Sequence, residues 1–217
     1  MAGKRRSGLK NDRRAYCNKP CIQISNECPP IILSNIATYS YDSKNNIDIW
    51  TLNGSVTILE CQILNIPINT QLVIPITVTF INNGTINNNG TIINSETINN
   101  NGTINNNEKI NNEGTINNNG TINNTGTIDN IIAILYNYNI INNTGTINIK
   151  NGSTINNNGT IYNTNGLIDI ISGTFNNNGT IDNTDGIINK YTSNLMIVSI
   201  FNNYGTLIGN IITIIEI

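Results

Sequence analysis

The chain has 217 residues, of which 49 are asparagine and 46 are isoleucine, so two residue types supply nearly half of it. Histidine is absent and charged residues make up only 11%. Without imidazole, the chain cannot build a Ser-His-Asp triad, a histidine proton shuttle or a histidine-bound zinc site. A composition this narrow indicates a short structural unit repeated many times, and we predict a protein that is not an enzyme.

Positive charge is concentrated at the start of the chain. Residues 1–19 hold seven of the eleven cations and one acid, although the formal net charge of the chain is −2. We expect six of these cations to form an anchoring arm: Lys4, Arg5, Arg6, Lys10, Arg13 and Arg14. Such an arm attracts a polyanion or an acidic neighbouring subunit, and salt weakens the attraction. The alternative is a solvated tail. Nucleic acid is not the expected partner, because no aromatic stacking platform or recognition helix accompanies the cations.

The cysteines all lie in the first third of the chain, at Cys17, Cys21, Cys28 and Cys61. We therefore expect a small, irregular N-terminal head over residues 1–50 and a repeat region over 51–217. Two disulfides that staple the head are favoured. The alternatives are free thiols and a four-thiolate zinc site, for which the Cys-x3-Cys spacing lacks a second close pair. No other metal and no cofactor is expected.

Neither a secretory signal nor a membrane span is expected. Residues 15–30 follow the basic start but are polar and cysteine-rich, without the apolar run of about 7–15 residues that a signal peptide contains. The most apolar stretches, 131–136 and 195–201, are far shorter than the ~20 residues of a membrane-crossing helix.

A large apolar residue recurs at every sixth position from Ile68 to Ile140, thirteen times in register. The repeated unit reads Gly-Thr-Ile-Asn-Asn-Asn, as at 84–89 and 114–119. Period six fits neither an amphipathic helix nor a long strand. Thr and Ile favour extended backbone, whereas Asn and Gly suit corners and tolerate left-handed conformations. Each hexad therefore predicts one short strand and one corner of a coil.

Stacked coils would place identical residues in rungs along one axis. Side chains alternate along a strand, so we expect Ile inside, Thr outside and Asn at the corners, with the Gly before each Thr leaving room inside. The expected structural core is Ile86, Ile92, Ile98, Ile104, Ile110, Ile116, Ile122 and Ile128. Many coils that share one core can stabilise a chain this polar, because nearest-neighbour terms add along the stack.

The spacing loosens after Ile140, so we expect regular hexads over 68–140 and looser coils over 141–217, with extra residues in corner loops. The fold class predicted is all-β: a single-chain β-solenoid, or parallel β-helix, with three short strands per coil. Prion-like aggregation is the competing interpretation, and the unbroken register argues against it. The apolar run 211–217 is expected to pack in a trimer or against a partner, or to support end-to-end assembly.

The hexad resembles the left-handed hexapeptide β-helix, whose motif pairs an aliphatic residue with a small residue four positions later, as Ile86 with Gly90 and Ile116 with Gly120. This resemblance favours a left-handed over a right-handed solenoid. The acyltransferases and carbonic anhydrases of that family rely on His, so the resemblance implies structure without activity. The Asn-Gly-Thr-Ile sequence motif is also similar to the passenger repeats of bacterial adhesins, which are right-handed β-helices. The composition is similar to that of Asn- and Ile-rich repeat proteins of giant DNA viruses of the mimivirus type.

The outer faces offer little chemistry. Asp182 and Asp185 are close enough in sequence for a weak cation or sugar site, with isolated solvating charges as the alternative. An outward threonine ladder that begins at Thr85 suggests an ice-binding array, but ice-binding solenoids favour two threonines per strand on one face. The Asn-x-Thr sequons, such as that at Asn83, are expected by-products of the repeat, since no signal peptide accompanies them.

We expect a structural protein with a β-solenoid shaft and an anchoring head. It would assemble as a homotrimer or stacked filament in a virion or an extracellular fibre, where the basic arm would contact other capsid or fibre proteins. The runner-up is an adhesin or receptor-binding module that contacts glycan or protein through loops at 149–153, 162–173 and 190–200. No residue is predicted to be catalytic.

Overall fold

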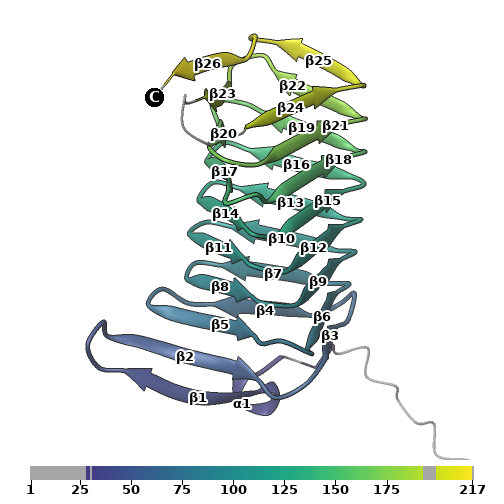
Figure 1. Ribbon diagram of the computed structural model, residues 1–217. Helices are drawn as coiled ribbons and strands as arrows, with labels where there is room; N and C mark the ends of the chain where they lie inside the picture. Colours follow the sequence, from purple (N-terminus) through teal and green to yellow (C-terminus); the bar gives the residue numbers. More distant parts are fainter. Residues whose placement is uncertain (1–27, 30, 193–198, 217) are drawn as a thin grey trace, which may run out of the picture.

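The computed structural model describes residues 28–29, 31–192 and 199–216, which form a parallel β-solenoid (Figure 1). From β2 onwards, each strand pairs in parallel with the strand three places further along the chain, so three strands make one coil. The predicted fold class is confirmed: the protein is all-β, with three sheets and three short strands per coil. Among the described residues no helix is long and apolar enough to cross a membrane.

Three sheets form the sides of the solenoid. The first sheet has ten strands: β1 (Ala37–Asp42), β2 (Ile47–Leu52), β5 (Thr70–Ile74), β8 (Thr91–Asn94), β11 (Lys109–Asn112), β14 (Thr127–Ile131), β17 (Thr146–Lys150), β20 (Leu167–Ile170), β23 (Ile187–Thr192) and β26 (Thr213–Glu216). The second has eight: β3 (Val56–Ile58), β6 (Thr79–Asn82), β9 (Thr97–Asn100), β12 (Thr115–Asn118), β15 (Ile134–Asn137), β18 (Thr154–Asn157), β21 (Thr174–Asn177) and β24 (Ile200–Asn203). The third has eight: β4 (Ile63–Ile66), β7 (Thr85–Asn88), β10 (Thr103–Asn106), β13 (Thr121–Asn124), β16 (Ile140–Asn143), β19 (Thr160–Asn163), β22 (Thr180–Asn183) and β25 (Thr206–Gly209).

Identical residues stack in register through the regular coils. On β10, Thr103 pairs with threonines on both neighbouring strands and Ile104 pairs with isoleucines. The corners are bonded between coils as well, since the Thr103 N–H donates to the Gly84 carbonyl oxygen at 2.8 Å. Backbone groups therefore find partners in the coil above or below, which short strands and tight corners could not supply within one coil.

The eight isoleucines expected in the core, from Ile86 to Ile128, are all buried. The predicted register starts too early, however, because Ile68 lies at a corner and is 72% exposed. On the strand that follows, Leu72 occupies the position that Ile92 takes one coil later. Ile74, the next member of the predicted series, is fully buried but takes the inward position that Asn94 holds one coil later, so the series before Phe80 does not follow a single rung.

The register also shifts after Ile128. Thr97 pairs with Thr115, eighteen residues on, but Thr115 pairs with Ile134, nineteen residues on. One extra residue in the corner at 131–133 moves the inward position to Leu135, which is fully buried. The prediction that Ile134 continues the inward series was wrong, because the neighbouring isoleucines hid a one-residue insertion.

Corner glycines are required by close backbone contact between coils. A Cβ atom at Gly102 would collide with the carbonyl oxygen of Gly84, and one at Gly120 with that of Gly102. Among the described glycines, a positive φ occurs only at Gly152 and Gly209, outside the regular hexads. Left-handed backbone does occur at the corner residues Asn69, Thr77 and Ile132, but at no residue from 79 to 130, so the expectation that the corners need it was wrong for those regular coils.

A hairpin and a short cap cover the N-terminal end of the stack (Figure 1). Strands β1 and β2 pair antiparallel, and β2 pairs in parallel with β5, so the hairpin extends the first sheet. The helical turn α1 (Leu33–Ile36) packs against the core through Leu33 and Ile36. A disulfide joins Cys28, before this turn, to Cys61, in the corner between β3 and β4. The head boundary expected at residue 50 falls inside β2.

Candidate functional site

The second asparagine of each Thr-Ile-Asn-Asn strand lies inside the solenoid. It shares the inward direction of the isoleucine two positions earlier, because side chains alternate along a strand. Fifteen asparagines are buried in this way among the described residues, and none is more than 1% exposed. The third asparagine of a hexad, such as Asn89, is exposed at a corner. The expectation that asparagine serves only at corners was therefore wrong.

Each buried amide joins two coils. The Nδ2 of Asn82 donates to the Oδ1 of Asn100 at 2.7 Å and to the Thr103 carbonyl oxygen at 3.0 Å. Both of its N–H groups are thus bonded. In later rungs such as Asn100 the Oδ1 also accepts a bond from the earlier amide, which completes the condition for burying an amide without a large desolvation cost. The same pattern gives a ladder in each sheet: residues 82, 100, 118, 137, 157, 177 and 203; residues 88, 106, 124, 143, 163 and 183; and residues 94, 112 and 130.

These inner ladders all point the same way, with each Nδ2 directed toward the later coil. The first amide of a ladder therefore receives no donor from an earlier one, and the Oδ1 atoms of Asn82 and Asn94 have no partner among the described residues. In the preceding coil the same positions hold Ile58 and Ile74. Each of these two ladders thus begins against an apolar rung.

Outer asparagine ladders run in the opposite direction. The Nδ2 of Asn123 donates to the Oδ1 of Asn105 at 2.8 Å, and Asn105 donates to Asn87 at 2.9 Å, each toward the earlier coil. Threonine hydroxyls lie beside these amides on the same strands. Over the regular coils, the outer faces of the second and third sheets are therefore neutral arrays of amide and hydroxyl groups that repeat every ~4.8 Å.

An ionic cluster lies on the first sheet. The Oδ1 of Asp129 accepts hydrogen bonds from Lys150 at 2.7 Å and from Asn148 at 2.8 Å, and its Oδ2 lies 3.1 Å from the Lys109 Nζ. Burial raises the pKa of Asp129, but the three donors outweigh burial and hold the pKa below its ordinary value. The carboxylate is occupied by protein cations, so it ties three neighbouring strands together. No group of three or more potential metal ligands gathers in the part of the chain that the structure describes.

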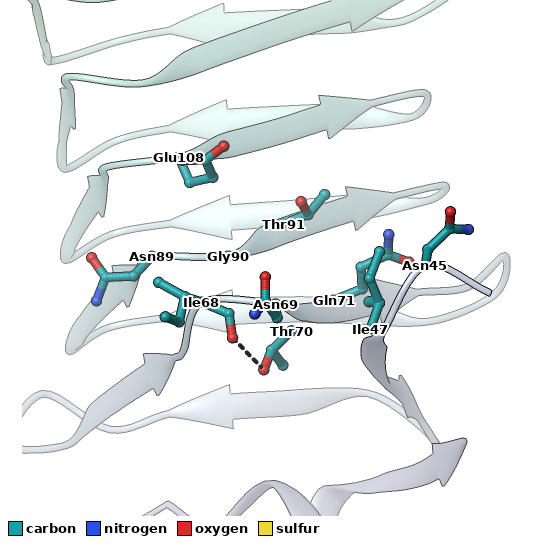
Figure 2. A pocket seen from close by; sticks show the side chains of 10 residues that line it. All are labelled: Asn45, Ile47, Ile68, Asn69, Thr70, Gln71, Asn89, Gly90, Thr91 and Glu108. Carbon is teal, nitrogen blue, oxygen red and sulfur yellow. Dashed lines mark hydrogen bonds between the residues drawn. The ribbon is translucent and has the colours of Figure 1, made fainter. Parts of the chain in front are cut away.

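A hollow of about 370 Å³ lies between the β1–β2 hairpin and two corners of the solenoid (Figure 2). Its lining residues come from the hairpin, from the start of β5 and from the next coils: Asn45, Ile47, Ile68, Asn69, Thr70, Gln71, Asn89, Gly90, Thr91 and Glu108. Amides and hydroxyls dominate, and Glu108 is the single carboxylate of the lining. The hollow can hydrogen-bond a small polar molecule, but it holds neither the paired acids of glycoside hydrolysis nor a nucleophile beside a base.

The other predicted site residues do not gather into a site. The Oδ1 of Asp182 accepts a hydrogen bond from the Thr184 N–H at 3.1 Å, while Asp185 is exposed at the following corner. The disulfide between Cys28 and Cys61 removes two of the four ligands that a thiolate zinc site would need. The remaining cysteines, Cys17 and Cys21, and all six cations of the anchoring arm lie outside the described residues.

The fold and its ladders define the class of the protein: a β-solenoid repeat protein whose coils are joined by buried asparagine amides. Comparisons with protein-family models, with curated proteins and with solved structures find no match.

Proposed function

We propose that the chain is a non-enzymatic structural protein, a β-solenoid shaft that assembles with copies of itself into a fibre or a component of a virus particle. The observation that carries this proposal is the continuity of the stack. Isoleucine and asparagine rungs follow one another coil after coil, so stability grows with the number of coils. The regular coils of the shaft present a largely neutral, amide-rich surface.

Two features of the sequence, its composition and its charge distribution, support the assignment to a virus particle. The Asn- and Ile-rich repeat is similar to those of mimivirus-type repeat proteins, and the basic arm of residues 4–14 would anchor the shaft to an acidic partner. The hairpin and cap cover the N-terminal end of the stack. This cover favours a side-by-side homotrimer over a head-to-tail filament.

A receptor-binding or glycan-binding module is the second candidate. The hollow beside Glu108 favours it, because its lining amides suit a polar, uncharged ligand. The loop at 149–153 adds a projecting turn, with Asn151 and Gly152 both at positive φ.

Light scattering coupled to size exclusion, together with negative-stain electron microscopy of the purified full chain, tests the proposal. A structural shaft should give rods or filaments, or particles with three times the 23.7 kDa mass of one chain. A monomer at every concentration, with no rods, would overturn it. If such a monomer also bound a glycan on an array, the second candidate would take its place.

A further inference from the structure

One coil carries apolar side chains on its outside where the neighbouring coils carry polar ones. On β15, Ile134 and Tyr136 point outward. The outward series continues on either side of this strand with Ile132 at the corner before it, and with Tyr138 and Ile140 after it. Of these, Ile132 is 75% exposed, Tyr138 49% and Ile134 36%. The five residues form a continuous apolar stripe, one coil wide, that crosses the second sheet and turns the corner to the third.

Neutral polar groups border the apolar stripe on both sides from Ile134 onwards, whereas Ile132 lies beside Lys150 of the next coil. In the coil before and the coil after, the residues paired with Ile134 are threonines and those paired with Tyr136 are asparagines. The bordering segments 115–121 and 154–160 contain no charged residue. A ligand on the stripe would therefore meet an apolar surface with hydroxyl and amide groups along each edge.

The two tyrosines are not required by the solenoid. Their ring centroids lie 5.9 Å apart and their planes are within 9° of parallel, so the rings form one ordered aromatic unit. They also interrupt two outer asparagine ladders, which reach Asn117 and Asn119 in the preceding coil. Asparagine at 136 and 138 would extend both ladders. With tyrosine at these positions, the outer amide hydrogen bonds to Asn117 and Asn119 are absent.

A second copy of the chain fits the apolar stripe poorly because the stripe is small. Eight backbone steps of about 3.3 Å give a length of at most ~26 Å, because the stripe bends at the corner that carries Tyr138. With a width of about 10 Å the area is on the order of 250 Å², whereas a stable dimer buries about 800 Å² on each partner. The straight part of the stripe on the second sheet, from Ile134 to the corner at Tyr138, is narrow and has polar borders, so it fits a short run of a linear ligand one chain thick, with an apolar face and hydroxyls on its edges.

We infer that the apolar stripe binds a linear, neutral polysaccharide. A pyranose ring presents C–H groups on its face, which pack on the ring of Tyr138, and hydroxyls at its edges, which hydrogen-bond the bordering Asn and Thr side chains. Since neither partner is charged, binding should depend little on salt. The inference goes beyond the proposed shaft, because it places a ligand on the side of the solenoid whether or not copies assemble.

Isothermal titration of the full chain with cellohexaose, chitohexaose, xylohexaose and maltohexaose tests the inference. The matched variant is Ile134→Thr/Tyr136→Asn/Tyr138→Asn. It introduces the Thr-x-Asn-x-Asn sequence pattern of residues 115–119 into this coil and leaves the buried Leu135 in place. The control variant is Tyr204→Asn. Tyr204 lies at the equivalent corner three coils on and is 76% exposed, but Asn202 stands where its aromatic partner would be.

The native chain and Tyr204→Asn should bind at least one of the four hexasaccharides saturably, and the triple variant should bind it at least tenfold more weakly with an unchanged circular dichroism spectrum. The inference is overturned if none of the four binds, or if the triple variant binds as the native chain does. Sedimentation supplies a further readout: a native dimer that the triple variant abolishes would show that the stripe is a contact between copies, and would overturn the inference. Because titration measures sugar binding and microscopy measures assembly, failure of this inference is distinguishable from failure of the proposed function.

Discussion

The Nδ2 of Asn100 donates a 2.7 Å hydrogen bond to the Oδ1 of Asn118, and both side chains are fully buried. One coil separates the two residues, so the bond runs along the axis of the stack. A polar side chain is thereby used as a core residue. The isoleucines remove apolar surface from water, and the asparagines fix the register of one coil on the next.

Removing one inner rung should be costly. In Asn118→Ala, the Nδ2 of Asn100 loses its acceptor inside the core and a cavity forms, so we expect the free energy of unfolding to fall by about 2–4 kcal/mol. Urea denaturation measures it. The neighbouring outer rung is the control: Asn117 donates to Asn99 at 2.9 Å but is partly exposed, so Asn117→Ala should cost less than about 1 kcal/mol. Equal losses for the two variants would contradict the structural role of the inner ladder.

A corner glycine should not tolerate a methyl group. In Gly102→Ala the added Cβ meets the Gly84 carbonyl oxygen of the coil before, so the two coils must move apart, at a cost of about 1–3 kcal/mol. Gly54→Ala is the matched control, because no heavy atom lies within 4 Å of a Cβ added there. Thermal unfolding of both variants compares the two sites, and a large loss at Gly54 with none at Gly102 would refute the close-contact explanation.

Asp129 should make the stack sensitive to acid. Its pKa is lower in the folded chain than in the unfolded chain, because its three donors outweigh burial. Its stabilising effect is therefore complete above its ordinary pKa of about 3.9 and is lost as the pH falls through the folded value. The difference in urea midpoint between the native chain and Asp129→Asn should therefore shrink steadily as the pH is lowered from about 5 to about 2. A constant difference over this range would exclude the ionic explanation.

The disulfide should hold the cap locally. In Cys28→Ser/Cys61→Ser we expect faster hydrogen exchange over residues 31–36. The variant lacks the cross-link between the cap and the corner that joins β3 to β4. The Gln62 side chain still donates to the Pro29 carbonyl oxygen at 2.9 Å, so the cap should loosen without being lost. Exchange over β10 and later strands should stay unchanged, since each coil contacts only its neighbours. Faster exchange throughout the solenoid would show that the cap controls the whole stack.

The isoleucine rungs could be predicted because a buried aliphatic residue at fixed spacing leaves a clear pattern. The asparagine ladders could not be found from hydrophobicity, since an amide scores as polar whether it faces water or a partner in the next coil. The alternation of side chains along a strand was the signal that could have revealed them. Asn88 stands two positions after Ile86, so on a strand both side chains point the same way. That signal was outweighed by the preference of asparagine for turns.

The remaining differences come from contacts between coils. The insertion at 131–133 was hidden because Ile132 and Ile134 both satisfy an apolar pattern, and only pairing with the neighbouring strands shows which residue turns inward. The apolar stripe was missed for the same reason. With Ile134 and Ile140 assigned to the core, the outward series to which Tyr136 and Tyr138 belong could not be recognised.

Exchange of asparagine side-chain amide protons, measured by nuclear magnetic resonance after transfer to D₂O, tests the inner ladders most directly. Amides buried between two coils, such as those of Asn100, Asn106 and Asn118, should keep their protons long after the exposed corner amides of Asn89 and Asn101 have exchanged. Loss of all asparagine side-chain amide signals at one common, fast rate would contradict the ladders, and with them the explanation of how so polar a chain forms a stable solenoid.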